Sequence, residues 1–160
     1  MTAPEPPGGP VAPRLAVVFA TVGFFALAIA GLGLASLFLD ADIIGVRGLG
    51  QIPGVAGMIL AGAAFAATLL VGVRAPHPSL WIAAIAAVTA WLGEAVGVVV
   101  GGLVTGGDSA AVVAAAGGVA VGWPGLVIAA AALVAGCGGV TLVRTRADRP
   151  RWPWERDDEE

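Results

Sequence analysis

Lysine, asparagine and tyrosine are absent from this 160-residue sequence, and charged residues make up only 12% of it. The single cysteine, Cys137, cannot form an internal disulfide, and the single histidine, His77, cannot build a metal site. We expect Cys137 to pack as a small apolar residue. All eight basic residues are arginine and 25 residues are glycine, a composition typical of a GC-rich genome such as that of an actinobacterium.

Groups of residues that could carry out catalysis are also absent. His77 lies in a proline-rich segment without a nucleophile or carboxylate beside it, and the neighbours Asp108 and Ser109 have no base. We find no P-loop, GxSxG, metal-ligand cluster or dinucleotide fingerprint, and no basic patch with interleaved aromatics. We therefore expect a protein that is not an enzyme by itself, with no cofactor, no metal ion and no nucleic-acid partner.

Long hydrophobic runs fill most of the sequence. Hydrophobic residues make up 58% of it and the mean hydropathy is +0.94, whereas soluble domains contain about 45–50% apolar residues and about 25% charged residues. A run of about 18 or more apolar residues is long enough to cross the bilayer core. The only charged residues inside the long runs are Glu94 and Asp108. The sequence therefore predicts an all-α integral membrane protein that has the lipid bilayer as its first partner.

The positions of prolines and polar residues divide these runs into four predicted spans. Pro53 suits the first turn of a helix, the prolines of RAPHP at 74–78 end one span, and Ser79 suits the N-cap of the next. We predict a four-transmembrane-helix bundle at 15–143, with spans at 15–39, 52–73, 79–104 and 121–143. Residues 1–14 form a Pro-rich N-terminus that we expect to be disordered, and residues 144–160 form a tail.

Two of these spans admit alternatives. The first could be a secretory signal peptide, because ALAIA at 26–30 offers a small-residue cleavage pattern, but the apolar run continues to Leu39 and favours an uncleaved helix. Near the end of the chain, Trp123 and Pro124 divide a run that is too long for one span. Residues 110–122 are then a re-entrant or interfacial piece, or an extension of the fourth span that is kinked at Pro124.

The distribution of arginine predicts the orientation. In the four-span interpretation only Arg47 falls on one side of the membrane, and the other side holds Arg14, Arg74, Arg144, Arg146, Arg149, Arg151 and Arg156. Because arginine-rich loops stay in the cytoplasm, we expect both termini to be cytoplasmic. The predicted location is the bacterial cell membrane.

Glu94 lies about 4 Å from the middle of the third predicted span, at 1.5 Å per residue. A charged side chain there costs about 2.5–3.5 kcal/mol on insertion scales, and the spans hold no lysine or arginine to pair with it. We therefore expect Glu94 to be protonated at pH 7 and to donate a hydrogen bond. The candidate partners are Thr21, Ser36, Thr68, the indoles of Trp91 and Trp123, carbonyls freed by Pro124, and another copy of the chain.

Small residues share the face of Glu94. At 100° per residue, Ala83, Ala87, Ala90 and Gly101 lie within about 40° of it and Gly97 within about 60°. Gly93, Gly97 and Gly101 form a doubled small-xxx-small pattern, which allows membrane helices to approach closely. We expect this face to contact another helix, more readily within one chain than in a dimer. Glu94 is then either a packed neutral acid, which we favour, or a proton- or cation-linked group in a transport path.

The C-terminal segment combines basic and aromatic residues. Arg144, Arg146, Arg149 and Arg151 with Trp152 and Trp154 are a candidate patch for anionic lipid headgroups. The alternative, which we favour, is that these arginines only fix the topology and that the tryptophans only lie at the interface. The acidic end of the tail is expected to be solvated.

The whole plan resembles that of small, uncharacterised four-helix membrane proteins of actinobacteria. The resemblance rests on the Pro-rich start, the loop DADIIGVRGLGQIPG at 40–54 and the ending RPRWPWERD at 149–157. It implies no activity. We therefore expect a non-catalytic structural or assembly subunit, as a homo-oligomer or within a larger membrane complex. The alternative is a small proton-coupled transporter or channel that uses Glu94.

Overall fold

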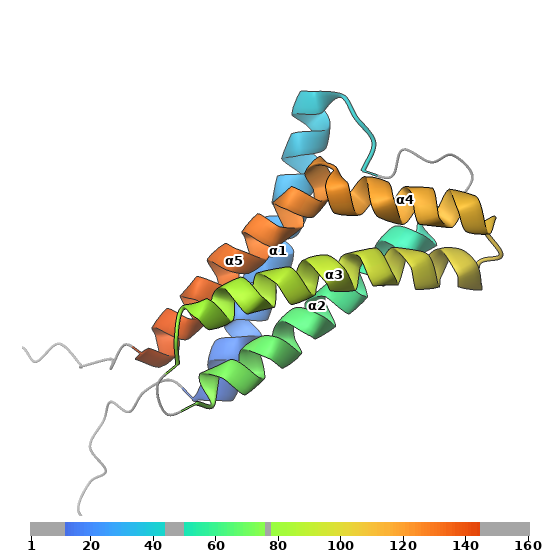
Figure 1. Cartoon of the computed structure of the whole chain (residues 1–160). Coiled ribbons are helices and arrows are strands. Elements are labelled where there is room, and N and C mark those ends of the chain that lie inside the picture. Colours follow the sequence, from blue (N-terminus) through green and yellow to red (C-terminus); the bar gives the residue numbers. More distant parts are fainter. Residues whose placement is uncertain (1–11, 44–49, 76–77, 145–160) are drawn as a thin grey trace, which may run out of the picture.

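The computed structural model describes residues 12–43, 50–75 and 78–144, and this part of the chain is helical between short connections (Figure 1). Its five helices are α1 (Pro13–Leu39), α2 (Ile52–Val73), α3 (Trp81–Val104), α4 (Ser109–Val121) and α5 (Trp123–Arg144). By length and composition α1, α2, α3 and α5 could each cross a membrane, whereas α4 is a shorter apolar helix. The prediction of an all-α protein with four candidate spans is confirmed to this extent.

The region before Pro124 is a helix of its own. Helix α4 ends at Val121, and Gly122 is extended, with φ −80° and ψ 179°. A proline at position 124 cannot donate to the carbonyl of Ala120 and its ring would clash with that carbonyl in a continuous helix, so α4 and α5 separate here. At 1.5 Å per residue α4 is about 20 Å long, which is too short for a bilayer core of about 30 Å. The fourth long helix therefore begins at Trp123, two residues after the predicted start.

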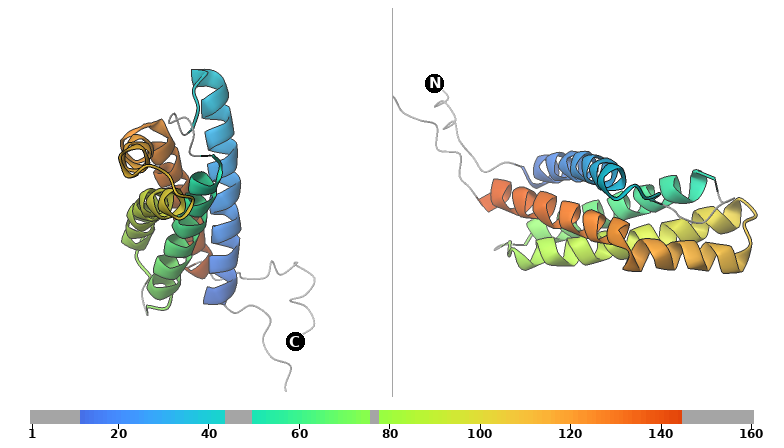
Figure 2. Two further views of the ribbon diagram at one scale, coloured as in Figure 1. Left: turned by 90° about the vertical axis from the view of Figure 1, so that its right-hand side faces the viewer. Right: turned by 90° about the horizontal axis from the view of Figure 1, so that it is seen from above.

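Helices α2 and α3 form the tightest pair of the fold. They run antiparallel along most of their length, while α5 packs between α1 and α3, and α4 lies along the second half of α3 (Figures 1 and 2). The C-terminal turns of α1 project beyond the other helices. The starts of α1 and α3 and the ends of α2 and α5 gather at one end of the molecule (Figure 1).

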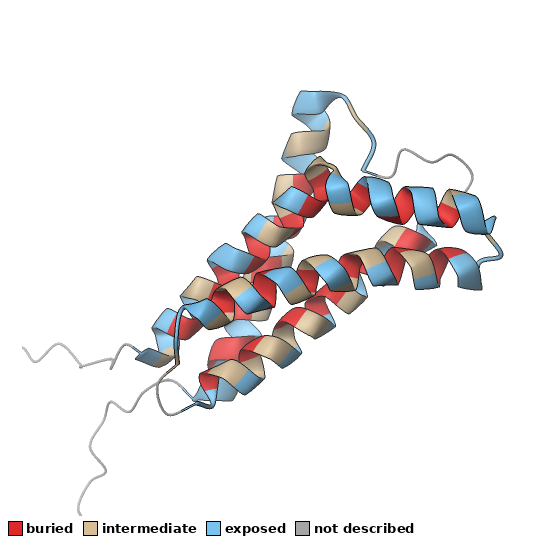
Figure 3. Cartoon of the chain, viewed as in Figure 1, coloured by how far each residue is buried: buried red, intermediate tan, exposed pale blue. Residues whose placement is uncertain are grey.

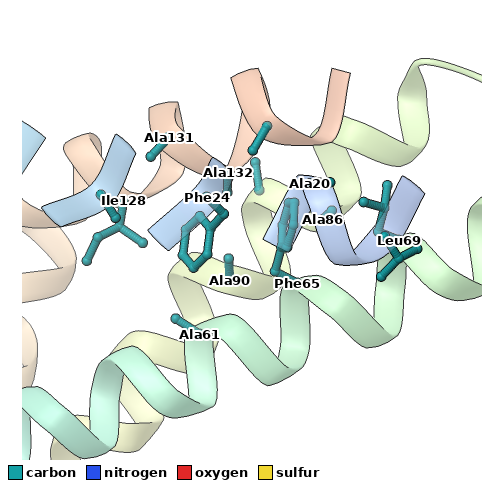
Figure 4. Packing of buried hydrophobic residues seen from close by; sticks show 14 of the residues in the cluster. Ala20, Phe24, Ala61, Phe65, Leu69, Ala86, Ala90, Ile128, Ala131 and Ala132 are labelled. Atoms are coloured by element: carbon teal, nitrogen blue, oxygen red, sulfur yellow. The ribbon is translucent and has the colours of Figure 1, made fainter. Parts of the chain in front are cut away.

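The core consists of a few aromatic and aliphatic side chains among alanines. Phe24 of α1 stacks on Phe65 of α2 with ring centroids 5.0 Å apart, and both side chains are fully buried. Ala90 of α3 and Ile128 of α5 belong to the same buried cluster (Figure 4). Alanines let the four helices approach closely around the stacked pair of Phe24 and Phe65.

Large apolar side chains cover the outside of the helices. Buried residues form inward-facing stripes along each helix, and the outward faces are exposed (Figure 3). These faces carry residues such as Leu37 and Phe38, the latter 83% exposed. A soluble helix would present charged and polar residues here, so the apolar exterior is suited to contact with lipid.

Replacement of Phe65 by alanine should destabilise the bundle by ~3 kcal/mol or more, because it removes the stacked ring and leaves a cavity in the centre. Unfolding by titration with a denaturing detergent measures the change. Phe38→Ala is the matched control, since the same substitution at an exposed side chain should cost less than about 0.5 kcal/mol. Equal losses in the two variants would contradict this core.

Candidate functional site

Glu94 is the one buried charged side chain in the described part of the chain, with 5% of it exposed. It lies in the middle of α3 and faces Gly57 of α2. A Cβ atom placed on Gly57 would lie 2.9 Å from Glu94 Oε1 and 3.0 Å from Cδ. Position 57 therefore has to lack a side chain for the carboxyl group to fit between the two helices.

The glycines around Glu94 bring the backbones of α2 and α3 into direct contact. A Cβ atom on Gly97 would lie 2.5 Å from both Ala56 O and Gly57 Cα, and one on Gly93 would lie 2.9 Å from Leu60 O. A Cβ atom on Gly101 would lie 2.9 Å from Pro53 Cα in the first turn of α2. We call this contact, from Gly93 to Gly101 on α3 and from Pro53 to Ala61 on α2, the α2–α3 seam. The small-xxx-small pattern is thus occupied by a helix of the same chain.

The hydroxyl groups proposed as partners of Glu94 bond elsewhere. Thr68 Oγ1 and Thr89 Oγ1 lie 3.0 Å apart across α2 and α3, and Thr89 also donates to Ala86 O. Thr21 and Ser36 donate to backbone carbonyls near their own helix positions, at 2.8 Å each. Each hydroxyl keeps lone pairs that could accept a bond from a protonated carboxyl group, but none of them forms a hydrogen bond with Glu94 in the described residues.

The carbonyl that Pro124 frees is also taken. Ala120 O would accept from the N–H of residue 124 in a continuous helix, but proline has no such donor. The indole of Trp91 supplies the bond instead, with Nε1 donating to Ala120 O at 2.9 Å. Gly125 makes this possible, because a Cβ atom there would lie 2.5 Å from Val119 O and 2.9 Å from Trp91 Nε1. This bond was not predicted from the sequence, although the missing N–H of Pro124 already indicated an orphan carbonyl at Ala120.

A hydrogen bond to another copy of the chain stays a prediction, but within the described residues Glu94 lacks the bond expected for it. Its Oε2 atom is buried and has no hydrogen-bond partner within residues 12–43, 50–75 and 78–144. Such an orphan atom costs about 1–3 kcal/mol, since it has lost water and gained no bond in exchange. No other ionisable residue occurs within α2 or α3. Glu94 does not serve local stability, and this makes it the candidate functional residue of the chain.

Three grooves among the described residues do not reach this carboxyl group. One of about 450 Å³ lies between α2 and α3 beside Thr68 and Ile82, and another of about 400 Å³ lies between α3 and α4 beside Val96 and Val113. A third, of about 260 Å³, separates α1 from α5. Glu94 lines none of the three, and all of them are predominantly apolar.

The remaining candidate residues lie at the edge of the structure or beyond it. Arg144 is the exposed last residue of α5, and Cys137 is a half-buried free cysteine. The described residues contain no group of three histidine, cysteine, aspartate or glutamate side chains that could hold a metal ion. His77 and the rest of the candidate headgroup patch, Arg146, Arg149, Arg151, Trp152 and Trp154, lie outside the described residues.

Replacement of Gly97 by alanine should destabilise the protein by about 1–3 kcal/mol, because the added methyl group meets rigid backbone of α2. Gly33→Ala is the matched control: a Cβ atom there has nothing within 4 Å, so the substitution should be neutral or should stabilise α1 by up to about 1 kcal/mol. Thermal unfolding in mild detergent compares the two. A harmless Gly97→Ala would refute the close contact at the seam.

The bond between Trp91 and Ala120 can be tested by a double-mutant cycle. Trp91→Phe should cost about 1–2 kcal/mol, because the carbonyl of Ala120 loses its donor. In a Pro124→Ala background the cost should fall, since an alanine at this position restores a backbone N–H four residues after Ala120. Strictly additive effects in the unfolding free energies would show that the indole does not replace the missing donor.

Substitutions of Glu94 separate shape from charge. Glu94→Gln preserves the shape and should change the unfolding free energy by less than about 0.5 kcal/mol, whereas Glu94→Leu puts a branched group against Gly57 and should cost about 1–3 kcal/mol. Thermal melts of the three proteins in detergent provide the comparison. If glutamine is as damaging as leucine, the carboxylate is charged and bound to something.

Comparison with known proteins adds one finding. The model of a family of unknown function, DUF6121, matches residues 12–160, while no curated protein and no solved structure matches the chain. This agrees with the expected resemblance to an uncharacterised family, and the actinobacterial part of that resemblance stays a prediction. Because the match covers nearly the whole sequence, the chain belongs to the DUF6121 family of unknown function.

Proposed function

We propose that this protein is a non-catalytic structural or assembly subunit of a larger complex in a bacterial cell membrane, with both termini cytoplasmic. The observation that carries the proposal is the sealed position of Glu94. The one buried carboxyl group of the described residues lies against Gly57, with no ionisable neighbour in α2 or α3 and no groove of the three reaching it. A transport path needs a chain of polar or water-filled positions, and these three apolar grooves of the described residues provide none that reaches Glu94.

The outer face of α4 supports a role in assembly. This helix exposes Ala110, Ala114, Gly117 and Gly118, and Cβ atoms on the two glycines would have nothing within 4 Å. Gly117 also borders the groove between α3 and α4. Exposed glycines leave the helix backbone without side-chain cover, an arrangement that suits a second helix better than lipid. The α3 glycines cannot serve this purpose, because α2 covers Gly93, Gly97 and Gly101, and Val112 of α4 covers Gly102.

The described arginines support the proposed orientation. Arg14, Arg74 and Arg144 stand at the end of the molecule where α1 begins and α5 ends (Figure 1). Arginine-rich ends stay in the cytoplasm during insertion, which supports placing both termini there.

Site-specific photocrosslinking in native membranes tests the assembly role. A photoreactive residue at Gly117 should yield a discrete crosslinked adduct of a protein, because this face contacts another helix. The matched control is the same residue at Val88, an outward-facing position of α3, which should react with lipid alone. A protein that gives no adduct from Gly117 and migrates as a monomer after mild extraction would refute the proposal.

A proton-coupled transporter or channel is the second candidate, and the orphan Oε2 atom of Glu94 is the observation that favours it. An unpartnered acid inside a membrane protein is a plausible carrier of protons. Reconstituted liposomes with an internal pH dye distinguish the two functions. The assembly role predicts no flux above empty liposomes, whereas a flux that is lost in Glu94→Gln would establish transport.

A further inference from the structure

The charges of the described residues are segregated by sign. Apart from Glu94, the described residues carry three arginines, Arg14, Arg74 and Arg144, and three aspartates, Asp40, Asp42 and Asp108. Arg14 lies in the first turn of α1, Arg74 follows the last residue of α2, and Arg144 ends α5. These element ends lie together in Figure 1, and we call this part of the molecule the basic end.

The aspartates are too far away to neutralise the basic end. Asp40 caps the far end of α1, about 39 Å from Arg14 at 1.5 Å per residue, and Asp108 caps the start of α4. Exposed charges interact little beyond a screening length of about 8 Å at physiological ionic strength. The three arginines are exposed, and none of their guanidinium groups forms an ion pair or hydrogen bond within the described residues.

The backbone at the basic end reinforces the positive charge. Helices α1 and α3 both start here, and neither has an acidic residue in its first turn. Arg74 and Arg144 stand at helix C-termini, where the dipole favours a cation, but Arg14 repeats the sign of the α1 dipole. The positive charge of Arg14 at the positive end of the α1 dipole is unfavourable by itself, and an external anion bound there would make it favourable.

Trp81 indicates which anion this is. It is the first residue of α3, at the basic end, and it is 77% exposed. Exposed tryptophans at the ends of membrane helices lie at the level of the lipid headgroups. The arginines at the same end of the bundle are then level with the phosphate groups of the surrounding leaflet.

We propose that the basic end, made of Arg14, Arg74 and Arg144 beside Trp81, binds the phosphate groups of anionic phospholipids. Charge complementarity carries the assignment, because three uncompensated guanidinium groups from three helices face a plane of negative charge. The site does not depend on the assembly role. It departs from the interpretation favoured from the sequence, in which Arg144 and the other C-terminal arginines only fix the topology, and it adds Arg14 and Arg74 to that candidate headgroup patch.

The experiment measures lipid preference of the full-length protein. Wild type is reconstituted in nanodiscs that contain phosphatidylcholine with increasing phosphatidylglycerol, and the enrichment of phosphatidylglycerol around the protein is determined by native mass spectrometry. Each arginine replaced by glutamine should weaken the preference roughly fivefold, which corresponds to about 1 kcal/mol per basic residue. The triple variant Arg14→Gln, Arg74→Gln, Arg144→Gln should lose most of it.

The matched control removes three charges from the opposite ends of the helices. Asp40→Asn, Asp42→Asn and Asp108→Asn together should leave the preference for phosphatidylglycerol unchanged. The wild-type preference should also fall as salt is added, a readout that needs no variant. If the triple arginine variant does not fold, Arg14→Gln is measured alone. A roughly fivefold weaker preference for phosphatidylglycerol in this variant would support the proposal, and an unchanged preference would contradict it.

Three results would overturn the proposal. Equal enrichment in wild type and the arginine variant would show that these residues do not bind the lipid. Competition by millimolar inorganic phosphate without any lipid preference would identify a site for free phosphate. A large rise in preference after deletion of Asp157–Glu160 would identify the acidic tail of the chain as the occupant of the basic end.

Discussion

The backbone contact between α2 and α3 is the constraint on which the rest of the structure depends. Lipid tails are as apolar as leucine side chains, so membrane helices gain little by hiding apolar surface from them and associate through close packing. Gly97 permits the closest approach, because a single added carbon would lie 2.5 Å from two backbone atoms of α2. Helix α5 then packs against the α2–α3 pair, mainly against α3, and α1 packs against α5.

This packing satisfies one polar side chain of α3 and leaves another without a hydrogen-bond partner. Trp91 turns toward the break before α5 and satisfies the carbonyl that Pro124 leaves open, so the kink in the chain is stabilised by a bond from α3. Glu94, one helical turn later, turns toward Gly57 and finds no donor or acceptor for Oε2 among the described residues. The indole of Trp91 therefore contributes to the stability of the fold. The carboxyl group of Glu94 gains no hydrogen bond from its position, so its presence in the seam requires a reason other than stability.

Much of the fold could be predicted because lipid imposes simple rules. The lengths of the apolar runs indicated four candidate spans, and the spacing of Gly93, Gly97 and Gly101 indicated a close helix contact. The partner of Glu94 could not be predicted, because a set of hydroxyls and indoles does not say which of them already bond to their own helix or to each other. Thr68 and Thr89 are one such pair. The kink at Gly122 was left between alternatives, since Pro124 fixes a break but not the direction in which α4 leaves it.

The most direct test is the infrared spectrum of the purified protein at pH 7 in the region of the carboxylic acid carbonyl. A neutral, unpartnered Glu94 in the α2–α3 seam predicts a carbonyl band at the high-frequency position of an acid without hydrogen bonds, and this band should vanish in Glu94→Gln. A wild-type spectrum without that band, in which the substitution removes a carboxylate signal instead, would contradict the account, because a charged Glu94 cannot remain in this seam without a partner.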